Sequence, residues 1–287
     1  MLGLGNMGSA VAERLLTAGY EVRVHNRTPA KAAPLEAQGA GRAEDAGDLA
    51  ASVDVLLTSL ADDRALEDVV PAVVDSAREG LVLADLSTVS PPASARVAAL
   101  TDDRGIAYLR APVSGNPSVV RAGNLGFIVS GPRNAFERVE PVMLDIGKTV
   151  QYVGAGEEAR VVKLAINLVI AGLAQLMAEA LVLAEGAGVS REALLETMGD
   201  SAAGAPFVKY KTEPLLRDDY SATFTTRLME KDIELVLDAA DAAGVRLPLA
   251  VEIESLVRST IDAGYGDDDF MALYPHLRSL AARTVPR

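Results

Sequence analysis

The sequence predicts an α/β protein in two parts: a doubly wound N-terminal domain, then an all-helical domain built on one long helix. Three observations lead to this prediction. A glycine-rich turn opens the chain, short apolar runs then alternate with helical patterns, and a proline-free helical stretch spans Glu157 to Ala187. At 287 residues and 49% hydrophobic content, the chain can bury more than one core. We expect the domains to be residues 1–153 and 154–287.

Composition excludes several classes of function. The net charge of −13 argues against nucleic acid or an anionic membrane as a general partner. Without cysteine there are no disulfides and no thiolate catalysis, and the two histidines, His25 and His276, disfavour a metal cluster or a Ser/His/Asp triad. No signal-peptide pattern opens the chain, and the most apolar window, Leu164–Ala178, is shorter than the roughly 20 residues of a membrane span. We expect a soluble cytoplasmic protein with no metal.

The first element in order is a glycine-rich turn ahead of a helix expected over Ser9–Ala18. Its residues are Gly3, Leu4, Gly5, Asn6, Met7 and Gly8. The spacing G-x-G-x-x-G is that of a Rossmann-type dinucleotide site, which needs a tight turn, close backbone approach to the pyrophosphate and close helix packing. Only Met1 and Leu2 precede the turn, so the first strand is unusually short for a central parallel strand. We predict that Gly3, Gly5, Asn6, Met7 and Gly8 bind the cofactor.

The second expected strand, Tyr20–His25, ends in Asn26, Arg27 and Thr28. An NAD-specific site would have an acidic residue here to hold the ribose 2′-hydroxyl. The uncharged Asn26, followed by a guanidinium and a hydroxyl, suits a 2′-phosphate instead. We therefore expect NADPH (NADP⁺) to be preferred over NADH. The alternative is that Arg27 is merely an exposed arginine in a turn.

The α/β alternation continues to residue 153. The expected helices are Pro29–Gln38, one from Arg64, Pro91–Thr101 and Asn134–Leu144. The expected strands are Val53–Ser59, Leu81–Leu86, Ile106–Leu109, Phe127–Ser130 and Thr149–Val153. Their apolar runs are typical of parallel strands buried on both faces.

Two loops follow strands at the edge where doubly wound folds bind ligands. One is Leu60-Ala61-Asp62 and the other is Ser87-Thr88-Val89-Ser90. The alternative for Ser87 and Thr88 is that they cap the helix that begins at Pro91.

Two further patterns offer groups for a substrate. In the turn-rich loop from Ala111 to Pro117, Ser114 supplies a hydroxyl, and the backbone amides of Gly115 and Asn116 could bind a carboxylate. In the long helix, Lys163 and Asn167 are four residues apart, which places them on one face. The alternatives are a simple turn, and a lysine that snorkels at a helix end.

In this order, the motifs resemble those of the β-hydroxyacid dehydrogenases, which include 3-hydroxyisobutyrate dehydrogenases and the tartronate semialdehyde and glyoxylate/succinic semialdehyde reductases. The matching residues are Gly3-x-Gly5-Asn6-Met7-Gly8, Asp85-Leu86-Ser87-Thr88, Ala111-Pro112-Val113-Ser114-Gly115, Lys163 with Asn167, and Phe224 seven residues before Lys231-Asp232. The resemblance covers essentially the whole chain. It implies that Lys163 is the catalytic acid/base, that Ser114, Gly115 and Asn167 bind substrate, that Lys231 closes over the cofactor, and that Leu60, Ala61 and Thr88 line the nicotinamide side.

The chain departs from the family pattern at several positions. Arg110 stands where an aspartate is usual, Asn116 replaces a second glycine, and Ile166 precedes Asn167 in place of an asparagine. The linker before Lys163 is three residues longer than the commonest form, which makes Arg160 a competitor for the catalytic position. We prefer Lys163 because it keeps Asn167 as its partner four residues on.

The remainder is predicted to be helical, over Arg191–Gly199, Leu228–Ala243, Pro248–Ala263 and Phe270–Ala282, with Gly244 and Gly264 as helix stops. Asp267-Asp268-Asp269 is interpreted as a cap for the last helix rather than a metal cluster, and His276 as a surface residue. So apolar a long helix favours a homodimer or higher homo-oligomer, as the resemblance also implies.

These features predict an NADPH-dependent oxidoreductase that interconverts a short aldehyde- or keto-acid and its hydroxyacid. Hydride transfer to a carbonyl leaves an alkoxide, to which a lysine ammonium can donate a proton. One alternative is an imine reductase, which Lys163 argues against because those enzymes usually lack the lysine. Another is a dinucleotide-binding module without activity. The sequence leaves the exact substrate and the physiological direction open.

Overall fold

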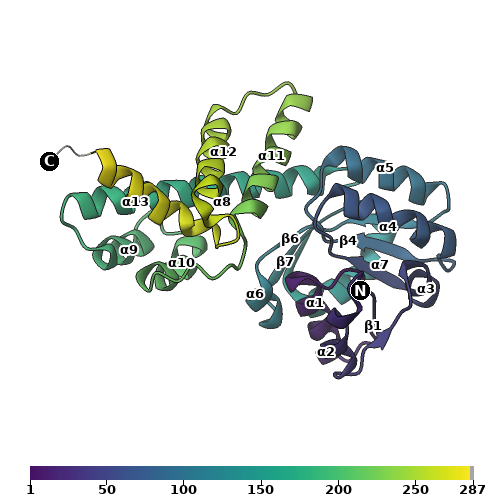
Figure 1. The fold of residues 1–287 in the computed structure, drawn as a ribbon. Coiled ribbons are helices and arrows are strands. Elements are labelled where there is room, and N and C mark those ends of the chain that lie inside the picture. The colour runs from purple at the N-terminus through teal and green to yellow at the C-terminus, as the bar shows by residue number, and fades with distance from the viewer. Residues whose placement is uncertain (285–287) are drawn as a thin grey trace. The chain divides into compact units, whose positions relative to one another are not determined.

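The structure is a computed structural model that describes residues 1–284. The chain forms two compact units, Met1–Lys163 and Leu164–Arg287 (Figure 1). The division falls ten residues after the boundary expected from sequence, because the long helix begins within the first unit. The boundary between residues 153 and 154 stays a prediction.

The first unit is built on a mixed sheet. The strands β3 (Val55–Thr58), β4 (Val82–Asp85) and β5 (Ala107–Arg110) run parallel, as predicted. Beyond β5, β7 (Leu125–Ser130) is antiparallel to β5, and it pairs with β6 (Val113–Ser114) and β8 (Gly147–Gly154). The register aligns Thr58, Asp85 and Arg110 at the carboxyl ends of β3, β4 and β5.

A separate pair of short parallel strands, β1 (Arg23–Val24) and β2 (Gly41–Arg42), lies on the other side of the first residues of the chain. Leu2 forms parallel bridges both to His25 and to Thr58, so it links β1 to β3. The first strand is therefore reduced to a bridging residue flanked by backbone hydrogen bonds.

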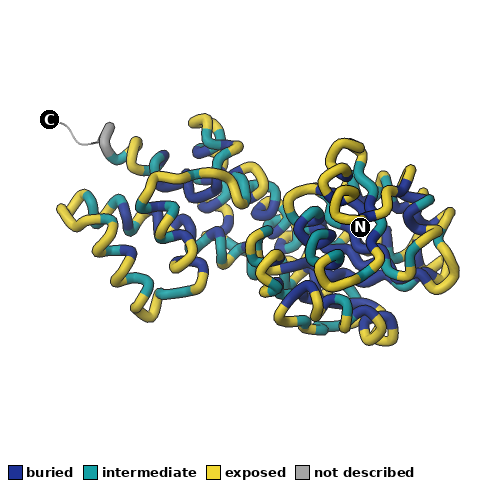
Figure 2. Tube along the Cα trace, turned by 90° about the horizontal axis from the view of Figure 1, so that it is seen from below, coloured by how far each residue is buried: buried dark blue, intermediate teal, exposed yellow. Residues whose placement is uncertain are grey.

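Helices cover both faces of this sheet (Figure 1). The residues of α3 (Ala46–Ser52), α4 (Asp63–Ser76) and α5 (Pro91–Asp102) share a core with Leu56 and Leu83. The opposite core joins α1 (Asn6–Thr17), α2 (Ala33–Glu36), α6 (Pro117–Arg121) and α7 (Arg133–Ile146) to Leu57 and Ala84. Successive strand residues point to opposite faces, so each strand serves both cores. The doubly wound prediction is confirmed. Strands β4 and β7 are almost entirely buried, and Figure 2 shows buried segments of the trace enclosed by exposed turns.

The second unit is all helical, as predicted. The long helix α8 (Glu158–Gly186) is followed by α9 (Arg191–Asp200), α10 (Pro206–Leu216), α11 (Thr226–Ala242), α12 (Pro248–Thr260) and α13 (Leu273–Thr284). One face of α8 packs its small residues Ala171, Ala174 and Ala178 into a core that also holds Phe207, Ile233, Val257 and Tyr274. Small side chains let neighbouring helices approach closely while the aromatic residues fill the remaining space.

The expectation that the apolar window is too short for a membrane span is wrong for the helix as a whole. At 29 residues, α8 is long and apolar enough, by length and composition, to cross a membrane, and 39% of its most apolar window is buried within the chain. The core helix of a soluble protein passes the same test. Exposed apolar residues along α8 are Val161, Val169, Leu176 and Leu183.

Several local predictions differ from the structure. The stretch Pro29–Gln38 divides into a 3₁₀ turn, Pro29–Lys31, and the short α2, and the expected strand Tyr20–His25 shortens to β1. Helices α3, α6 and α10 and strands β2 and β6 were absent from the sequence prediction. Gly244 and Gly264 do adopt left-handed conformations at helix ends. The prediction that His276 is a surface residue is wrong, because the ring is buried and its Nε2 lies 2.9 Å from Ser259 Oγ.

Candidate active site

The N-terminus of α1 offers uncapped backbone amides. Its N-cap is Gly5, no side chain caps it, and its first turn holds no acidic residue. By contrast, side chains of Asp45, Asp62 and Ser90 cap α3, α4 and α5. Gly5 and Asn6 are exposed and Met7 is half-buried. Free N–H groups and the positive end of the helix dipole make this terminus suitable for a phosphate.

The three glycines of this turn differ in their surroundings. A Cβ on Gly3 would lie 2.3 Å from the carbonyl oxygen of Ser59, and one on Gly8 would lie 2.0 Å from that of Gly3. A Cβ on Gly5 would meet nothing within 4 Å. Gly3 and Gly8 are therefore required by packing, whereas Gly5 leaves open space beside the helix terminus. This arrangement fits a pyrophosphate that approaches the backbone at Gly5.

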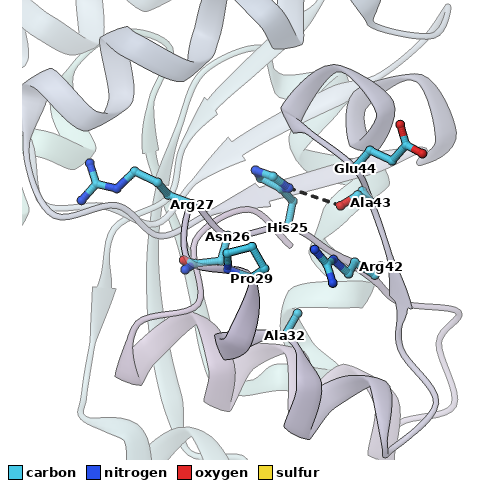
Figure 3. A pocket seen from close by; sticks show the side chains of 8 residues that line it. All are labelled: His25, Asn26, Arg27, Pro29, Ala32, Arg42, Ala43 and Glu44. Carbon is cyan, nitrogen blue, oxygen red and sulfur yellow. Dashed lines mark hydrogen bonds between the residues drawn. The ribbon is translucent and has the colours of Figure 1, made fainter.

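A pocket of about 190 Å³ lies beyond the end of β1 (Figure 3). It is lined by His25, Asn26, Arg27, Pro29, Ala32, Arg42, Ala43 and Glu44. The side chain of Asn26 is fixed, because its Oδ1 accepts a hydrogen bond from the Leu4 amide at 2.9 Å and its Nδ2 donates to the Thr28 carbonyl at 3.1 Å. Asn26 thus ties the strand end to the glycine-rich turn.

Two arginines line this pocket. Arg27 is exposed, and Figure 3 shows its guanidinium extending away from Pro29 and Ala32. Arg42, which the sequence reasoning missed, comes from β2, and its guanidinium lies 3.9 Å from the Glu36 carboxylate. Arg42 stands well apart from Arg27 in the chain, so only the pairing of β1 with β2 brings the two to one pocket.

Asp85 at the end of β4 joins the two loops that sequence predicted at the ligand-binding edge. Its Oδ1 accepts hydrogen bonds from Thr58 Oγ1 and Ser87 Oγ, both at 2.6 Å. Ser87 Oγ in turn accepts one from the Leu60 amide at 2.9 Å. The capping alternative for Ser87 is wrong, since Ser90 caps α5. Among the predicted nicotinamide-side residues, Leu60 and Thr88 are half-buried and Ala61 is exposed.

The second oxygen of Asp85 pairs with Arg160, whose side chain is fully buried. Arg160 Nη2 donates to Asp85 Oδ2 at 2.5 Å and to Tyr108 Oη at 2.9 Å. Its Nη1 donates to the Ser87 carbonyl at 2.6 Å, and its Nε to Ser94 Oγ at 3.2 Å. Burial by itself would lower the pKa of Arg160, but Tyr108 and Asp85 outweigh burial and raise it. A guanidinium that stays charged and enclosed is a poor proton donor, which argues against Arg160 as the catalytic group.

Arg110, a departure from the family pattern, has its own acidic partner. Its Nε donates to Glu157 Oε1 at 2.9 Å, and its Nη2 contacts the same oxygen. The guanidinium also lies 4.8 Å from the centre of the Tyr108 ring. Glu157 immediately precedes α8, so two ion pairs attach the start of this helix to the ends of β4 and β5.

The loop expected to bind substrate forms β6 and the start of α6. Ser114 and Gly115 are exposed. Gly115 has φ of +140°, and a Cβ there would lie 2.9 Å from Val119, so glycine is required at this position. The side chain of Asn116 caps α6, because its Oδ1 accepts a hydrogen bond from the Val119 amide at 3.1 Å.

Lys163 is half-buried in the second turn of α8. In the second unit, Asn167 is buried, and its Nδ2 donates to Asp232 Oδ2 at 2.6 Å. Lys231 Nζ lies 2.9 Å from the other oxygen of Asp232. Asp232 is thus the residue that holds Asn167 and Lys231 together, a role that the motif alone did not reveal.

Among the described residues, one group of three carboxylates, Glu230, Glu234 and Glu254, is close enough to hold a metal ion. Arg258 pairs with all three. The guanidinium already neutralises part of this charge. The aspartates at 267–269 do not form such a group: Asp269 caps the turn that starts at Phe270, as predicted.

Both parts of the chain match family models of nicotinamide-dependent dehydrogenases. Residues 1–154 match the family model of the NAD-binding domain of 6-phosphogluconate dehydrogenase. Residues 154–277 match the model described as the NAD-binding domain of NADP-dependent 3-hydroxyisobutyrate dehydrogenase. The 2-(hydroxymethyl)glutarate dehydrogenase of Eubacterium barkeri is 32% identical over 276 residues, which cover 95% of this chain and 92% of that protein.

Solved structures extend the comparison. A 3-hydroxyisobutyrate dehydrogenase of Mycobacterium tuberculosis, determined with L-serine, has a TM-score of 0.88 at 30% identity and covers 96% of this chain and 97% of its own. An imine reductase from Pseudomonas sp. covers the same shares of the two chains with a TM-score of 0.61 at 26% identity. The imine reductase is the more distant of the two. Because both family models describe NAD-binding domains, the cofactor of this chain is a nicotinamide dinucleotide.

The different surroundings of the glycines generate a paired prediction. Gly5→Ala should leave the melting temperature near the parental value and weaken dinucleotide binding, because the added methyl group occupies the open space at the helix terminus. Gly8→Ala should lower the melting temperature, because its methyl group would overlap the Gly3 carbonyl. Calorimetric titration with NADPH and thermal unfolding measure both effects. Unchanged affinity for NADPH in a folded Gly5→Ala protein would contradict the assignment of the pyrophosphate to this turn.

Proposed function

Because the chain belongs to the β-hydroxyacid dehydrogenase family and is an NAD(P)-dependent oxidoreductase, we propose that it interconverts a short aldehyde- or keto-acid and its hydroxyacid, with NADPH as the preferred cofactor. The observation that carries the proposal is the position of Lys163, one turn after Arg160, on a helix whose start is attached by ion pairs to the ends of β4 and β5. Such strand ends are where doubly wound folds bind ligands.

Lys163 is the acid/base of the proposed reaction. When bound, the nicotinamide would supply a hydride to the carbonyl carbon. As the carbonyl C=O bond becomes a C–O⁻ single bond, Lys163 Nζ donates a proton to the oxygen, and in the oxidation direction it takes the proton back. Asn167, held at one end by Asp232, orients the substrate, and the groups that bind its carboxylate are Ser114, Gly115 and Asn116.

The cofactor is assigned to the first unit, and the family resemblance assigns Lys231 of the second unit to cofactor binding. Its diphosphate is placed at the turn formed by Gly3, Gly5, Asn6, Met7 and Gly8. The nicotinamide is placed beside Leu60, Ala61 and Thr88. We assign the adenosine end to the pocket that Asn26 and Arg27 line, and Thr28 follows them in the chain without lining it. The cations Arg27 and Arg42 both line that pocket, which supports a 2′-phosphate and hence NADPH.

The substrate class is tested by a panel. NADPH consumption is measured with glyoxylate and with succinic semialdehyde, and NADP⁺ reduction is measured with 3-hydroxyisobutyrate, L-serine and 2-(hydroxymethyl)glutarate. A cyclic imine tests the imine reductase alternative. That alternative is suggested by the similarity of this chain to a solved imine reductase, and Lys163 argues against it. Turnover of an acid substrate well above that of the imine is the expected result. Turnover of the imine alone would replace the proposal, and cofactor binding without any turnover would leave a binding module.

We further propose residues 1–153 as the cofactor domain and 154–287 as the substrate and dimerisation domain of a soluble, cytoplasmic homodimer. The exposed apolar residues Val169, Leu176 and Leu183 recur every seven residues along α8, and these residues are between 57% and 75% exposed. An apolar stripe of this kind is typical of a protein–protein interface.

The cofactor assignment predicts a selective loss in Arg27→Ala. Removing one charge-assisted contact should raise the KM for NADPH by about ten- to a hundredfold and leave the KM for NADH nearly unchanged. Arg42→Ala should also raise the KM for NADPH. The control is Arg64→Ala, which should change the KM for neither cofactor, because the Arg64 side chain is 90% exposed on α4. Steady-state kinetics with both cofactors are the measurement. Equal losses for NADPH and NADH would contradict the 2′-phosphate assignment.

The acid/base assignment predicts that Lys163→Ala lowers kcat by about 10²–10⁴-fold. NADPH affinity should survive, because the proposed dinucleotide contacts lie elsewhere. Lys163→Arg should restore little, since a guanidinium does not release its proton near neutral pH. The control is Lys209→Ala, which removes an exposed lysine and should leave kcat unchanged. A folded Lys163→Ala protein that binds NADPH and keeps the parental turnover would move the acid/base role to another residue.

The dimer assignment predicts that Leu176→Glu converts the protein to a monomer, because a buried carboxylate without a partner is unfavourable in an interface. Light scattering coupled to size exclusion measures the mass. Leu100→Glu, at an exposed leucine of the first unit, should leave the mass unchanged. A parental protein that elutes as a monomer, or one that partitions into detergent, would contradict the assignment.

A further inference from the structure

We propose that Arg160 is a positioning residue: its buried contacts hold the first turn of α8, and with it Lys163, in register with the loops that follow β3 and β4. The inference rests on the proposed function, because Arg160 acts through Lys163 as the proton donor. It goes beyond that function by assigning a residue that contacts neither the substrate nor the cofactor.

The side chain of Arg160 connects several elements of the first unit by hydrogen bonds. All three guanidinium nitrogens donate hydrogen bonds, and their acceptors come from three elements: β4 with its following loop, α5 and β5. The planar guanidinium fixes the directions of its N–H groups, so contacts to several elements define one position for the side chain. Burial raises the pKa of Tyr108 to about 12, so its hydroxyl stays neutral and accepts from Arg160.

The same network reaches the loops assigned to the nicotinamide. Asp85 holds Arg160 with one oxygen and Ser87 with the other, and Ser87 holds the backbone of Leu60. Arg160 also binds the Ser87 carbonyl directly at 2.6 Å. Loss of Arg160 therefore leaves the buried Asp85 carboxylate without its counter-charge and loosens the loop that carries Ser87.

Lys163 follows Arg160 by three residues on a continuous helix, a rise of about 4.5 Å along the axis. Because the intervening turn is hydrogen-bonded helix, a displacement of Arg160 moves the backbone of Lys163 with it. The Arg110–Glu157 pair steadies the residue just before the helix from the neighbouring strand. A misplacement of about 1 Å at a reacting group can lower a rate by about 10²-fold.

Stability alone does not account for this arrangement. A buried ion pair contributes little relative to a well-packed apolar pair, although breaking one member is strongly destabilising. The chain offers a matched control in the second unit, where Lys211 Nζ lies 2.6 Å from Asp269 and both side chains are buried. Arg160→Met and Lys211→Met each remove one cation from a buried pair, but only the first lies one turn from Lys163.

The test compares Arg160→Met, Arg160→Lys and Lys211→Met for melting temperature, kcat and the KM for NADPH, with the panel compound that the parental protein turns over fastest. Both methionine variants should lose thermal stability. Arg160→Met alone should lower kcat, by about ten- to a hundredfold, with a much smaller change in the KM for NADPH. Arg160→Lys should restore part of kcat, since it keeps the charge beside Asp85 but not the full set of contacts. Parental kcat in folded Arg160→Met would overturn the inference.

If Arg160→Met does not fold, Tyr108→Phe carries the test, because it removes one contact of Arg160 and keeps the ion pair. A several-fold loss of kcat without a matching stability loss supports the inference, and parental kcat in both Tyr108→Phe and Arg160→Lys overturns it.

A double-mutant cycle separates this inference from the proposed function. If Arg160 acts through Lys163, its substitution should have little further effect on kcat in the Lys163→Ala protein. Multiplying losses would mean that Arg160 acts independently, which overturns the inference and leaves the acid/base assignment intact. Parental turnover in Lys163→Ala, with a loss in Arg160→Met, would overturn the acid/base assignment and the inference with it.

Discussion

The buried ion pair between Asp85 and Arg160 is the interaction on which the first unit depends. Asp85 stands at the end of β4, where the register places it beside Thr58 and Arg110. Its two oxygens accept hydrogen bonds from Thr58 on β3, from Ser87 in the following loop and from Arg160 at the start of α8. Neither charge reaches solvent, so each requires the other, and removal of one partner is expected to destabilise by about 3–5 kcal/mol. The network thereby couples folding of the sheet to the helical turn that precedes Lys163, the proposed acid/base.

Local patterns in the sequence were enough to predict much of the fold. The alternation of apolar runs and helical periods predicted the doubly wound unit, because each strand buries both faces and each helix buries one. The glycine spacing predicted the turn before α1 for the reason visible at Gly8, where only a missing side chain allows the helix to pack against the Gly3 carbonyl. Helix α10 was missed because Pro206 and Pro214 resemble breaks, although the first opens the helix and the second lies within its last turn.

The remaining features depend on contacts between distant residues. Arg42 reaches the pocket through the pairing of β1 with β2, and Asn26 turns its amide to Leu4 in the glycine-rich turn. Asp232 holds Asn167 across a sequence separation of 65 residues. In the sequence Arg160 competes with Lys163 for the catalytic position, whereas in the structure its side chain is fully buried and paired with Asp85. No periodicity or motif encodes such pairings, so the sequence could supply the residues but not their partners.

The central claim is that the ammonium of Lys163 supplies the proton, and chemical rescue tests it most directly. Small primary amines such as ethylamine are added to the Lys163→Ala protein during turnover of the substrate that the parental protein prefers. The account predicts that kcat rises in proportion to amine concentration, that the rescue depends on the pKa of the amine as a proton donor, and that the parental protein does not respond. An alanine variant with low activity and no response to any amine that fits the vacated space would contradict it.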